Sequence, residues 1–118
     1  MYESGEMYLE TLLVLSKKKN KVRAIDISSE MGISKPSVSR ALSKLRTEEC
    51  ILVGDDGGLI FTDKGRQIAE KIFERHQILT NLLKMIGVDE KNAVADACKM
   101  EHDISDLTFE KIKSFVNK

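Results

Sequence analysis

The sequence contains little that breaks or cross-links a chain. Its 118 residues include seven glycines and a single proline, Pro36, so long helices are favoured elsewhere. Two cysteines, Cys50 and Cys98, are too few for a disulfide framework. No apolar run exceeds that of residues 12–15, far below the roughly 18 residues that a membrane helix needs. The N-terminus also lacks the basic and apolar regions of a signal peptide. We therefore expect a mainly α protein in the cytoplasm, with no membrane partner.

Charge is balanced over the whole chain but not along it. The 19 Lys and Arg residues equal the 19 Asp and Glu residues, so net charge indicates no particular partner. Residues 17–46, however, contain nine basic residues and two acidic ones, a local excess of seven positive charges. A protein that binds the phosphate backbone of a nucleic acid needs such a local excess of positive charge. A chain of 13.3 kDa is also too short for a large catalytic α/β fold, and we expect no enzyme.

The first half of the chain has the element order of a winged helix-turn-helix. Apolar spacing and turn residues predict helices over residues 7–16 and 23–31, a turn at Gly32, a third helix capped by Ser34, and a hairpin of residues 50–53 and 59–62. In such an order the third helix enters the major groove of DNA and the hairpin forms the wing.

The second half is predicted to be helical throughout. Thr62 and Asp89 are suited to cap helices that cover about residues 63–86 and 90–103, and Ser105 or Asp106 is suited to open a last helix near the C-terminus. We therefore expect a DNA-binding domain over residues 1–62 and a second, helical unit over residues 63–118.

The polar positions of the third helix form the candidate DNA-binding surface: Ser34, Lys35, Ser37, Ser39, Arg40 and Lys44. Arg40 is the best candidate for a guanine edge, because its planar fork can form two hydrogen bonds there. The serines and the two lysines are better suited to phosphates. Asp55 and Asp56 would be repelled by phosphate, so we expect a small contribution from the wing.

Potential metal ligands occupy positions where apolar side chains are expected. The predicted helix over residues 90–103 carries a stripe of Val94, Ala97, Cys98, Glu101 and His102. Its thiol, carboxylate and imidazole would lie on one side of a helical turn. His76 interrupts the apolar stripe of the long helix, where an unpartnered ring would be costly. Met7 and Glu10, three residues apart, offer similar geometry in the first helix. Taken singly, a buried His, Met or Cys is more typical of a core, but together these residues indicate a divalent cation site.

Cys50, in an apolar run, is expected to be a core residue.

The sequence resembles the DtxR/MntR family of metal-dependent transcriptional repressors. The resemblance covers nearly the whole chain and rests on residues 6–10, 33–39, 59–65, 75–76, 86–90 and 98–102. It implies a homodimer whose N-terminal winged helix binds double-stranded operator DNA and whose C-terminal helices dimerise, with a divalent metal as corepressor. The chain resembles the short form, which lacks an SH3-like domain.

The resemblance also carries over ligands position by position. Met7, Cys98, Glu101 and His102 match the primary site of the iron-responsive branch, whereas the manganese branch would have carboxylates in place of Met7 and Cys98. Glu10 and His76 match ligands of the manganese branch, and His76 also matches an ancillary ligand of the iron branch. Thr80 and Val94 depart from that ancillary site. Because thiolate and thioether are soft donors, we expect Fe(II), with Mn(II), Co(II), Ni(II) or Zn(II) as alternatives.

Other functions stay open on sequence grounds. The main alternative is a metal-independent winged-helix repressor of the MarR-like kind, in which Cys98 would sense oxidants. A small metalloenzyme is less well supported, because the sequence offers no evident pair of nucleophile and base. A protein-interaction module is disfavoured by the basic segment.

Overall fold

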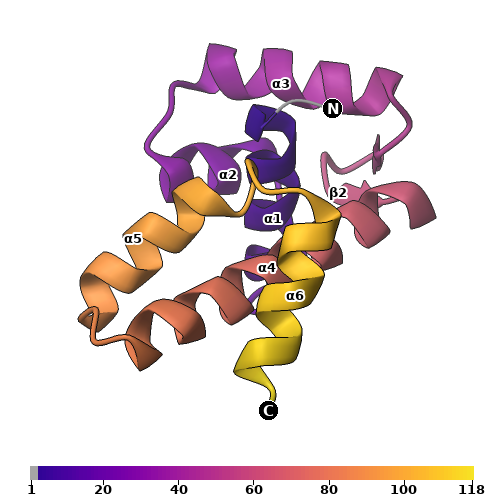
Figure 1. Cartoon of the computed structure of the whole chain (residues 1–118). Coiled ribbons are helices and arrows are strands. Elements are labelled where there is room, and N and C mark those ends of the chain that lie inside the picture. Colours follow the sequence, from indigo (N-terminus) through magenta and orange to yellow (C-terminus); the bar gives the residue numbers. More distant parts are fainter. Residues whose placement is uncertain (1–2) are drawn as a thin grey trace. The chain divides into compact units, whose positions relative to one another are not determined.

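The computed structural model describes residues 3–118. Met1 and Tyr2, which begin the stretch used to argue against a signal peptide, lie outside the described residues. The described chain contains six helices and two short strands (Figure 1), which confirms a mainly α fold. It divides into two compact units, one up to Glu70 and one over Lys71–Lys118, and each is described separately below. None of the helices within residues 3–118 has the length and apolar character needed to cross a membrane.

Three helices and a hairpin build the first unit. They are α1 (Glu3–Ser16), α2 (Ala24–Met31), α3 (Lys35–Thr47), β1 (Ile51–Val53) and β2 (Leu59–Phe61). The first helix begins four residues before the predicted start at residue 7. The core consists of apolar side chains from α1, α2, α3 and β1, including Leu9, Ile27, Val38, Leu45 and Ile51, each at most 2% exposed. This unit is therefore held by the hydrophobic effect.

The turn between α2 and α3 has the geometry that the sequence predicts. Gly32 adopts a left-handed conformation with φ 65°, which glycine adopts without the steric cost of a Cβ atom. The Ser34 side chain then accepts a hydrogen bond from the backbone N–H of Ser37 and caps α3. Together these two residues end one helix and begin the next.

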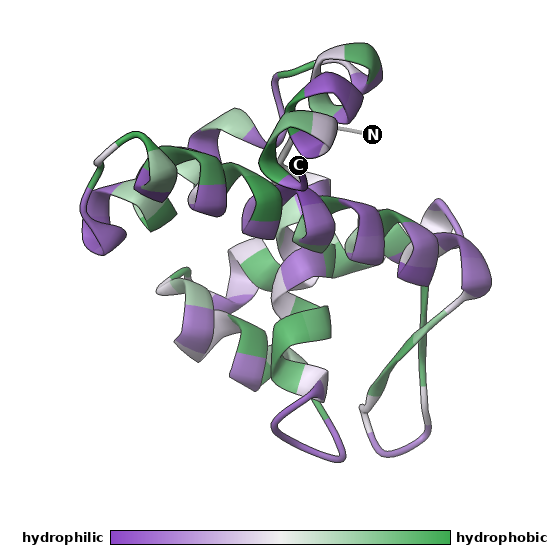
Figure 2. Ribbon diagram, turned by 60° about the horizontal axis from the view of Figure 1, so that its bottom comes forward, coloured by the Kyte–Doolittle hydropathy of each residue, from purple (hydrophilic) through white to green (hydrophobic). Residues whose placement is uncertain are grey.

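The hairpin is a two-stranded antiparallel sheet in which Leu52 pairs with Ile60. The strands are hydrophobic and the tip is hydrophilic (Figure 2). Asp56 at the tip forms an ion pair with Lys21, which holds the pKa of Asp56 down at about 2. Arg23 donates from Nε to the backbone carbonyl of Asp56 over 3.1 Å. The acidic tip is thus partly neutralised by the basic segment that precedes α2.

A close contact fixes the start of α4 (Asp63–Met85) against Cys50, the residue before β1. The backbone N–H of Gly65 donates to the hydroxyl of Thr62 over 3.1 Å, as expected of a helix cap. A Cβ atom at Gly65 would lie 1.9 Å from the carbonyl oxygen of Cys50. Only glycine fits at this point without displacing the backbone.

The second unit comprises the rest of α4 together with α5 (Glu90–Met100) and α6 (Asp106–Val116). Asp89 and Ser105 cap the last two helices, as predicted. The predicted end of the fifth helix at residue 103 was wrong. It ends at Met100, because the carbonyl groups of Glu101 and Ile104 accept hydrogen bonds from Arg75 rather than from a further helical turn.

The buried face of α5 also differs from the predicted stripe. Ala93 and Ala97 are fully buried, whereas Val94 is 40% exposed and Cys98 is exposed. Of the predicted stripe, Ala97 and Glu101 are buried, whereas Val94 and Cys98 are not.

Candidate functional site

The polar positions of α3 mostly face solvent. Lys35, Ser39, Arg40 and Lys44 are exposed, whereas the apolar positions Val38, Leu42 and Leu45 are buried. The helix is thus amphipathic, and its charged face is available for a partner.

Three of the six predicted DNA-binding residues, Ser34, Ser37 and Arg40, contact one another. Ser34 donates from its hydroxyl to Oγ of Ser37 over 3.0 Å and caps the helix. Arg40 donates from Nη2 to Oγ of Ser37 over 3.3 Å. The hydroxyl of Ser37 therefore orients the guanidinium group that is the best candidate for base recognition.

The basic segment before α2 is partly paired within the first unit. Lys19 forms an ion pair with Asp26 at 2.6 Å, and Lys21 pairs with Asp56. Asp26 is already included in the excess of seven charges over residues 17–46, so of these two pairs only that of Lys21 with Asp56 lowers the excess further.

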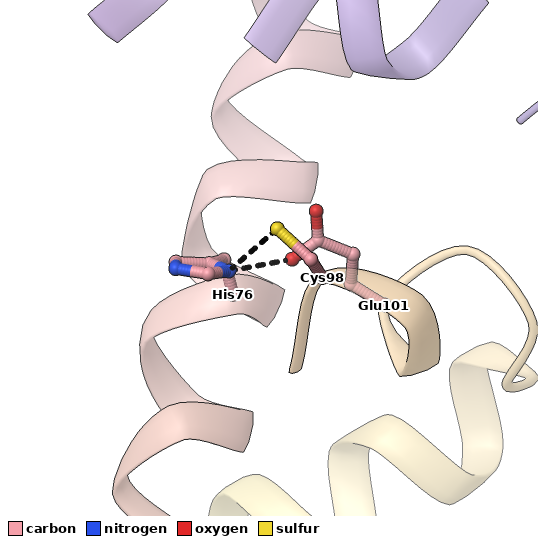
Figure 3. Close-up of side chains that lie close together, drawn as sticks. All are labelled: His76, Cys98 and Glu101. Atoms are coloured by element: carbon pink, nitrogen blue, oxygen red, sulfur yellow. Dashed lines mark hydrogen bonds and ion pairs between the residues drawn. The ribbon is translucent and has the colours of Figure 1, made fainter. Parts of the chain in front are cut away.

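Three of the six predicted metal ligands come together in the second unit (Figure 3). Nδ1 of His76, on α4, lies 2.9 Å from Oε2 of Glu101 and 4.0 Å from Sγ of Cys98. One ligand atom from each residue lies within 4.8 Å of the other two. The cluster thus offers nitrogen, oxygen and sulfur donors around one point.

Burial makes Glu101 the unusual member of this cluster. It is 0% exposed, and a buried carboxylate is costly unless it is paired or bound to a metal. Its Oε1 has no hydrogen-bond partner among the described residues, although Nε2 of His102 lies 3.4 Å away. Figure 3 shows one carboxylate oxygen directed to His76 and the other directed away from it.

The donor set fits a divalent transition metal. Two ligands bound at about 2.0–2.3 Å in a tetrahedral arrangement lie roughly 3.3–3.8 Å apart. The observed separations of 2.9 Å and 4.0 Å bracket that range. Small side-chain movements of His76, Cys98 and Glu101 would therefore suffice for binding, and a cation would satisfy the orphan oxygen of Glu101.

The other three predicted ligands are His102, Met7 and Glu10. His102 directly follows Glu101 and has a nearly buried side chain, 1% exposed. Met7 and Glu10 lie on α1, in the first unit, where Met7 is exposed and Glu10 is partly buried. The cluster of the second unit therefore contains His76, Cys98 and Glu101, with His102 beside it.

The second cysteine takes no part in this cluster. Cys50 is 0% exposed, and burial raises the pKa of its thiol above the ordinary value. It is a core residue, as predicted, and lies in the first unit.

Arg75 is a functional candidate that the sequence reasoning missed. It is 5% exposed and donates two hydrogen bonds to the segment that connects α5 with α6 and one to Asp106 at the start of α6. A signal was present, because Arg75 falls between Ile72 and Leu79 at helical spacing, on the face that is otherwise apolar. A charged residue at such a position requires partners.

Comparison with known proteins identifies both halves of the chain. The family profile "Iron dependent repressor, N-terminal DNA binding domain" matches residues 1–59. The profile "Iron dependent repressor, metal binding and dimerisation domain" matches residues 62–118. The chain belongs to the DtxR/MntR family of metal-dependent transcriptional repressors. This family consists of transcriptional regulators, not enzymes, as expected from the sequence.

Individual relatives of the DtxR/MntR family support this membership. The HTH-type transcriptional regulator MntR of Geobacillus kaustophilus is 32% identical over 113 residues, which are 96% of this chain and 80% of that protein. The transcriptional regulator MntR of Escherichia coli O157:H7 is 32% identical over 111 residues, 94% of this chain and 72% of that protein. Both are similar along almost the whole chain.

Solved structures of the DtxR/MntR family share the fold. The manganese regulator SloR has a TM-score of 0.84 and 27% identity, over 96% of this chain and 53% of that one. ScaR with bound Zn²⁺ has a TM-score of 0.80 and 26% identity, over 96% of this chain and 53% of that one. The chain thus spans about half the length of these solved relatives.

Proposed function

We propose that the protein is a metal-dependent transcriptional repressor that responds to Fe(II). The observation that carries the proposal is the cluster of His76, Cys98 and Glu101, in which a buried carboxylate oxygen lacks a hydrogen-bond partner among residues 3–118. When bound, a divalent cation would supply the positive charge that this carboxylate lacks.

The full ligand set that we propose is Met7, Glu10, His76, Cys98, Glu101 and His102. Met7 and Glu10 belong to α1 in the DNA-binding unit, and the other four belong to the second unit. Ligands from both units would couple metal occupancy to the placement of α3, and such coupling is reciprocal by thermodynamic necessity. We propose domain limits near residue 62, the last residue before α4.

Cys98 and Met7 support Fe(II) over Mn(II) as the signal. Soft sulfur donors bind Fe(II), Co(II), Ni(II) and Zn(II) better than Mn(II), which prefers oxygen. The wild-type protein should therefore bind Fe(II) more tightly than Mn(II). Cys98→Asp replaces the sulfur donor by oxygen and should reduce the ratio of the Fe(II) affinity to the Mn(II) affinity. A wild-type preference for Mn(II) would contradict the assignment of Fe(II).

The partner that we propose is double-stranded operator DNA in the cytoplasm. Arg40 would contact a base edge, and Lys35, Lys44 and the α3 serines would contact phosphates. A homodimer would present two such helices to half-sites about one helical turn apart. Large apolar side chains exposed on the second unit support self-association: Met85, Ile86, Val94, Leu107 and Phe115.

The experiment is DNA binding with and without metal. Duplexes are first selected from a random pool by the wild-type protein with Fe(II), in the absence of oxygen. Affinity for a selected duplex is then measured with Fe(II) and with a chelator. Fe(II) should raise the affinity about 10–100-fold, the usual size of allosteric coupling. Equal affinity in both conditions would exclude a corepressor role.

Matched variants locate the effect. Glu101→Gln removes the buried carboxylate and should abolish the response to Fe(II). Glu110→Gln makes the same change at an exposed position of α6 and should leave the response to Fe(II) intact. The MarR-like alternative predicts no response to Fe(II) in any of these proteins.

A further inference from the structure

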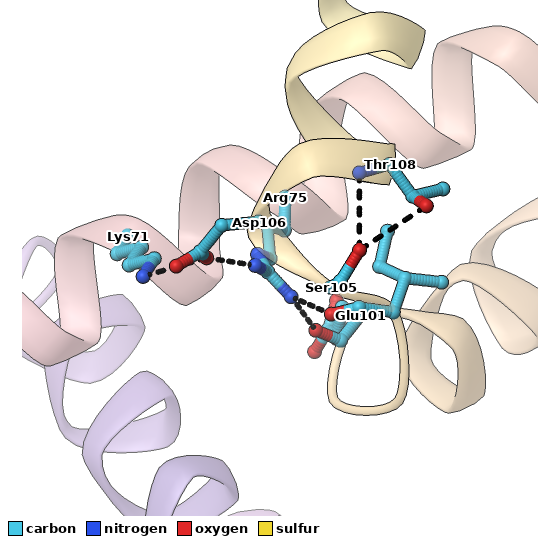
Figure 4. A network of polar contacts seen from close by, with 7 residues as sticks. Lys71, Arg75, Glu101, Ser105, Asp106 and Thr108 are labelled. Atoms are coloured by element: carbon cyan, nitrogen blue, oxygen red, sulfur yellow. Dashed lines mark hydrogen bonds and ion pairs between the residues drawn. The ribbon is translucent and has the colours of Figure 1, made fainter.

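Arg75 links two segments of the second unit through a buried guanidinium group (Figure 4). Its Nη1 donates to the backbone carbonyl of Glu101 over 3.1 Å and to that of Ile104 over 2.8 Å. Its Nη2 donates to Oδ1 of Asp106 over 2.5 Å. One side chain of α4 thus holds the end of α5, the connecting segment and the start of α6.

The neighbouring residue, His76, holds the same glutamate at its other end. Nδ1 of His76 lies 2.9 Å from Oε2 of Glu101, while Arg75 binds the main-chain carbonyl of Glu101. Two consecutive residues of α4 therefore fix both the backbone and the carboxylate of Glu101.

The charge of Arg75 is compensated, so that it adds little repulsion to a cation site. Asp106 accepts from Arg75 and also pairs with Lys71 at 2.9 Å. Lys71, and to a lesser extent Arg75, hold the pKa of Asp106 below its ordinary value. The guanidinium carbon also lies 5.2 Å from the centre of the Phe109 ring, a cation–π contact.

We propose that Arg75 is a positioning residue of the metal centre, which sets the place of the Glu101 carboxylate by holding its backbone carbonyl. The proposal rests on the function proposed above. Groups behind the ligands commonly tune metal affinity about 10–100-fold. Arginine is required because its rigid fork bonds two carbonyls and a carboxylate at once, whereas lysine offers a single flexible ammonium group.

The test uses Co(II) as the probe, with the full chain kept free of oxygen. Coordination by a thiolate gives an absorption band in the near ultraviolet, and the visible bands of Co(II) report the coordination geometry. The proteins are wild type, Arg75→Met, which removes every donor, and Arg75→Lys, which keeps the charge. Lys113→Met is the control, because it breaks the 2.9 Å ion pair between α6 and Glu74 in the same unit without touching Glu101.

We expect Arg75→Met to bind Co(II) at least tenfold more weakly than wild type and to show altered visible bands. Arg75→Lys should fall between the two, and Lys113→Met should match wild type. The melting temperature of each metal-free protein is measured as well. If Arg75→Met does not fold, Arg75→Lys and Asp106→Asn are used instead. We expect Asp106→Asn to bind Co(II) a few-fold more weakly than wild type.

A purely structural role gives a different result. Folded Arg75 variants would then melt at a lower temperature but keep the wild-type Co(II) affinity and visible spectrum, and this outcome overturns the proposal. If wild type itself shows no thiolate-to-Co(II) band, the proposed metal centre fails and the role of Arg75 fails with it. The two failures are thus distinguished by the wild-type spectrum.

Discussion

The two units differ in what they bury. The first unit has an apolar core from α1 to β1, and no charged residue of its described part is buried. The second unit buries Arg75 and Glu101, the two charged residues that are buried within residues 3–118. Apolar burial stabilises a fold directly, whereas a buried charge costs free energy unless it is fully paired.

This difference indicates a division of roles. The first unit exposes most of the proposed DNA-binding residues of α3 on its surface. In the second unit Arg75 and His76 hold the buried Glu101. A charge that contributes little to stability is best explained by what it binds.

The largest expected effect is steric and falls in the first unit. Gly65→Ala would place a Cβ atom 1.9 Å from the carbonyl oxygen of Cys50, so α4 would have to move away from the hairpin. The free energy of unfolding should fall by about 3 kcal/mol, the upper range for overpacked sites. Urea unfolding measures this loss. A loss below about 1 kcal/mol would show that the backbone around Gly65 and Cys50 moves apart at little cost and would contradict the predicted clash.

The next effect concerns binding rather than stability and falls in the second unit. Glu101→Gln should weaken Fe(II) binding about 100-fold, which corresponds to about 2.7 kcal/mol. The metal-free variant should unfold close to wild type, because the carboxamide can still accept a hydrogen bond from His76. Anaerobic Fe(II) titration with a competing chelator gives the affinity. An unchanged affinity would remove Glu101 from the metal centre.

A smaller loss is expected at the start of α3. Ser34→Ala removes the hydroxyl that accepts from Ser37 N–H and should lower stability by about 1 kcal/mol, as is usual for an N-cap. Thermal unfolding measures it, with Ser39→Ala as the control, because Ser39 is exposed on the same helix. Equal effects of the two variants would argue against capping.

A gain in stability is expected where α3 ends. Glu49 has φ 63°, a left-handed conformation that costs residues with a side chain about 1 kcal/mol. Glu49→Gly should therefore raise the free energy of unfolding by roughly 0.5–1 kcal/mol. Urea unfolding at neutral pH tests this. A destabilised variant would show that the Glu49 side chain has a compensating contact.

The smallest effect depends on pH and concerns Asp106. Lys71, and then Arg75, lower the pKa of this carboxylate in the folded protein. The ion pairs therefore stabilise the fold at neutral pH, and this contribution is lost as the pH falls below about 4 through the lowered pKa. Wild type should lose more stability than Asp106→Asn over that acidic range. Parallel curves of melting temperature against pH would contradict the pairing.

Local signals explain why much of the fold was predictable from the sequence. Gly32, Ser34, Asp89 and Ser105 mark helix ends by their own chemistry, and all four occupy the expected positions. The metal cluster was partly predictable too, since His76, Cys98 and Glu101 are polar residues in or beside apolar stripes.

The errors arose where tertiary contacts override local pattern. The end of α5 depends on Arg75, which lies 26 residues before Glu101 in the sequence. The close approach of Gly65 to Cys50 is likewise invisible to periodicity. The exposure of Cys98 follows from the choice of Ala93 and Ala97 as the buried face, which spacing alone does not decide.

The most direct test of the account is the affinity of the wild-type protein for Fe(II) with and without a selected DNA duplex. Linkage requires DNA to strengthen Fe(II) binding by the same factor by which Fe(II) strengthens DNA binding. The account predicts an increase of about 10–100-fold when the duplex is present. An Fe(II) affinity that is the same with and without DNA would contradict it.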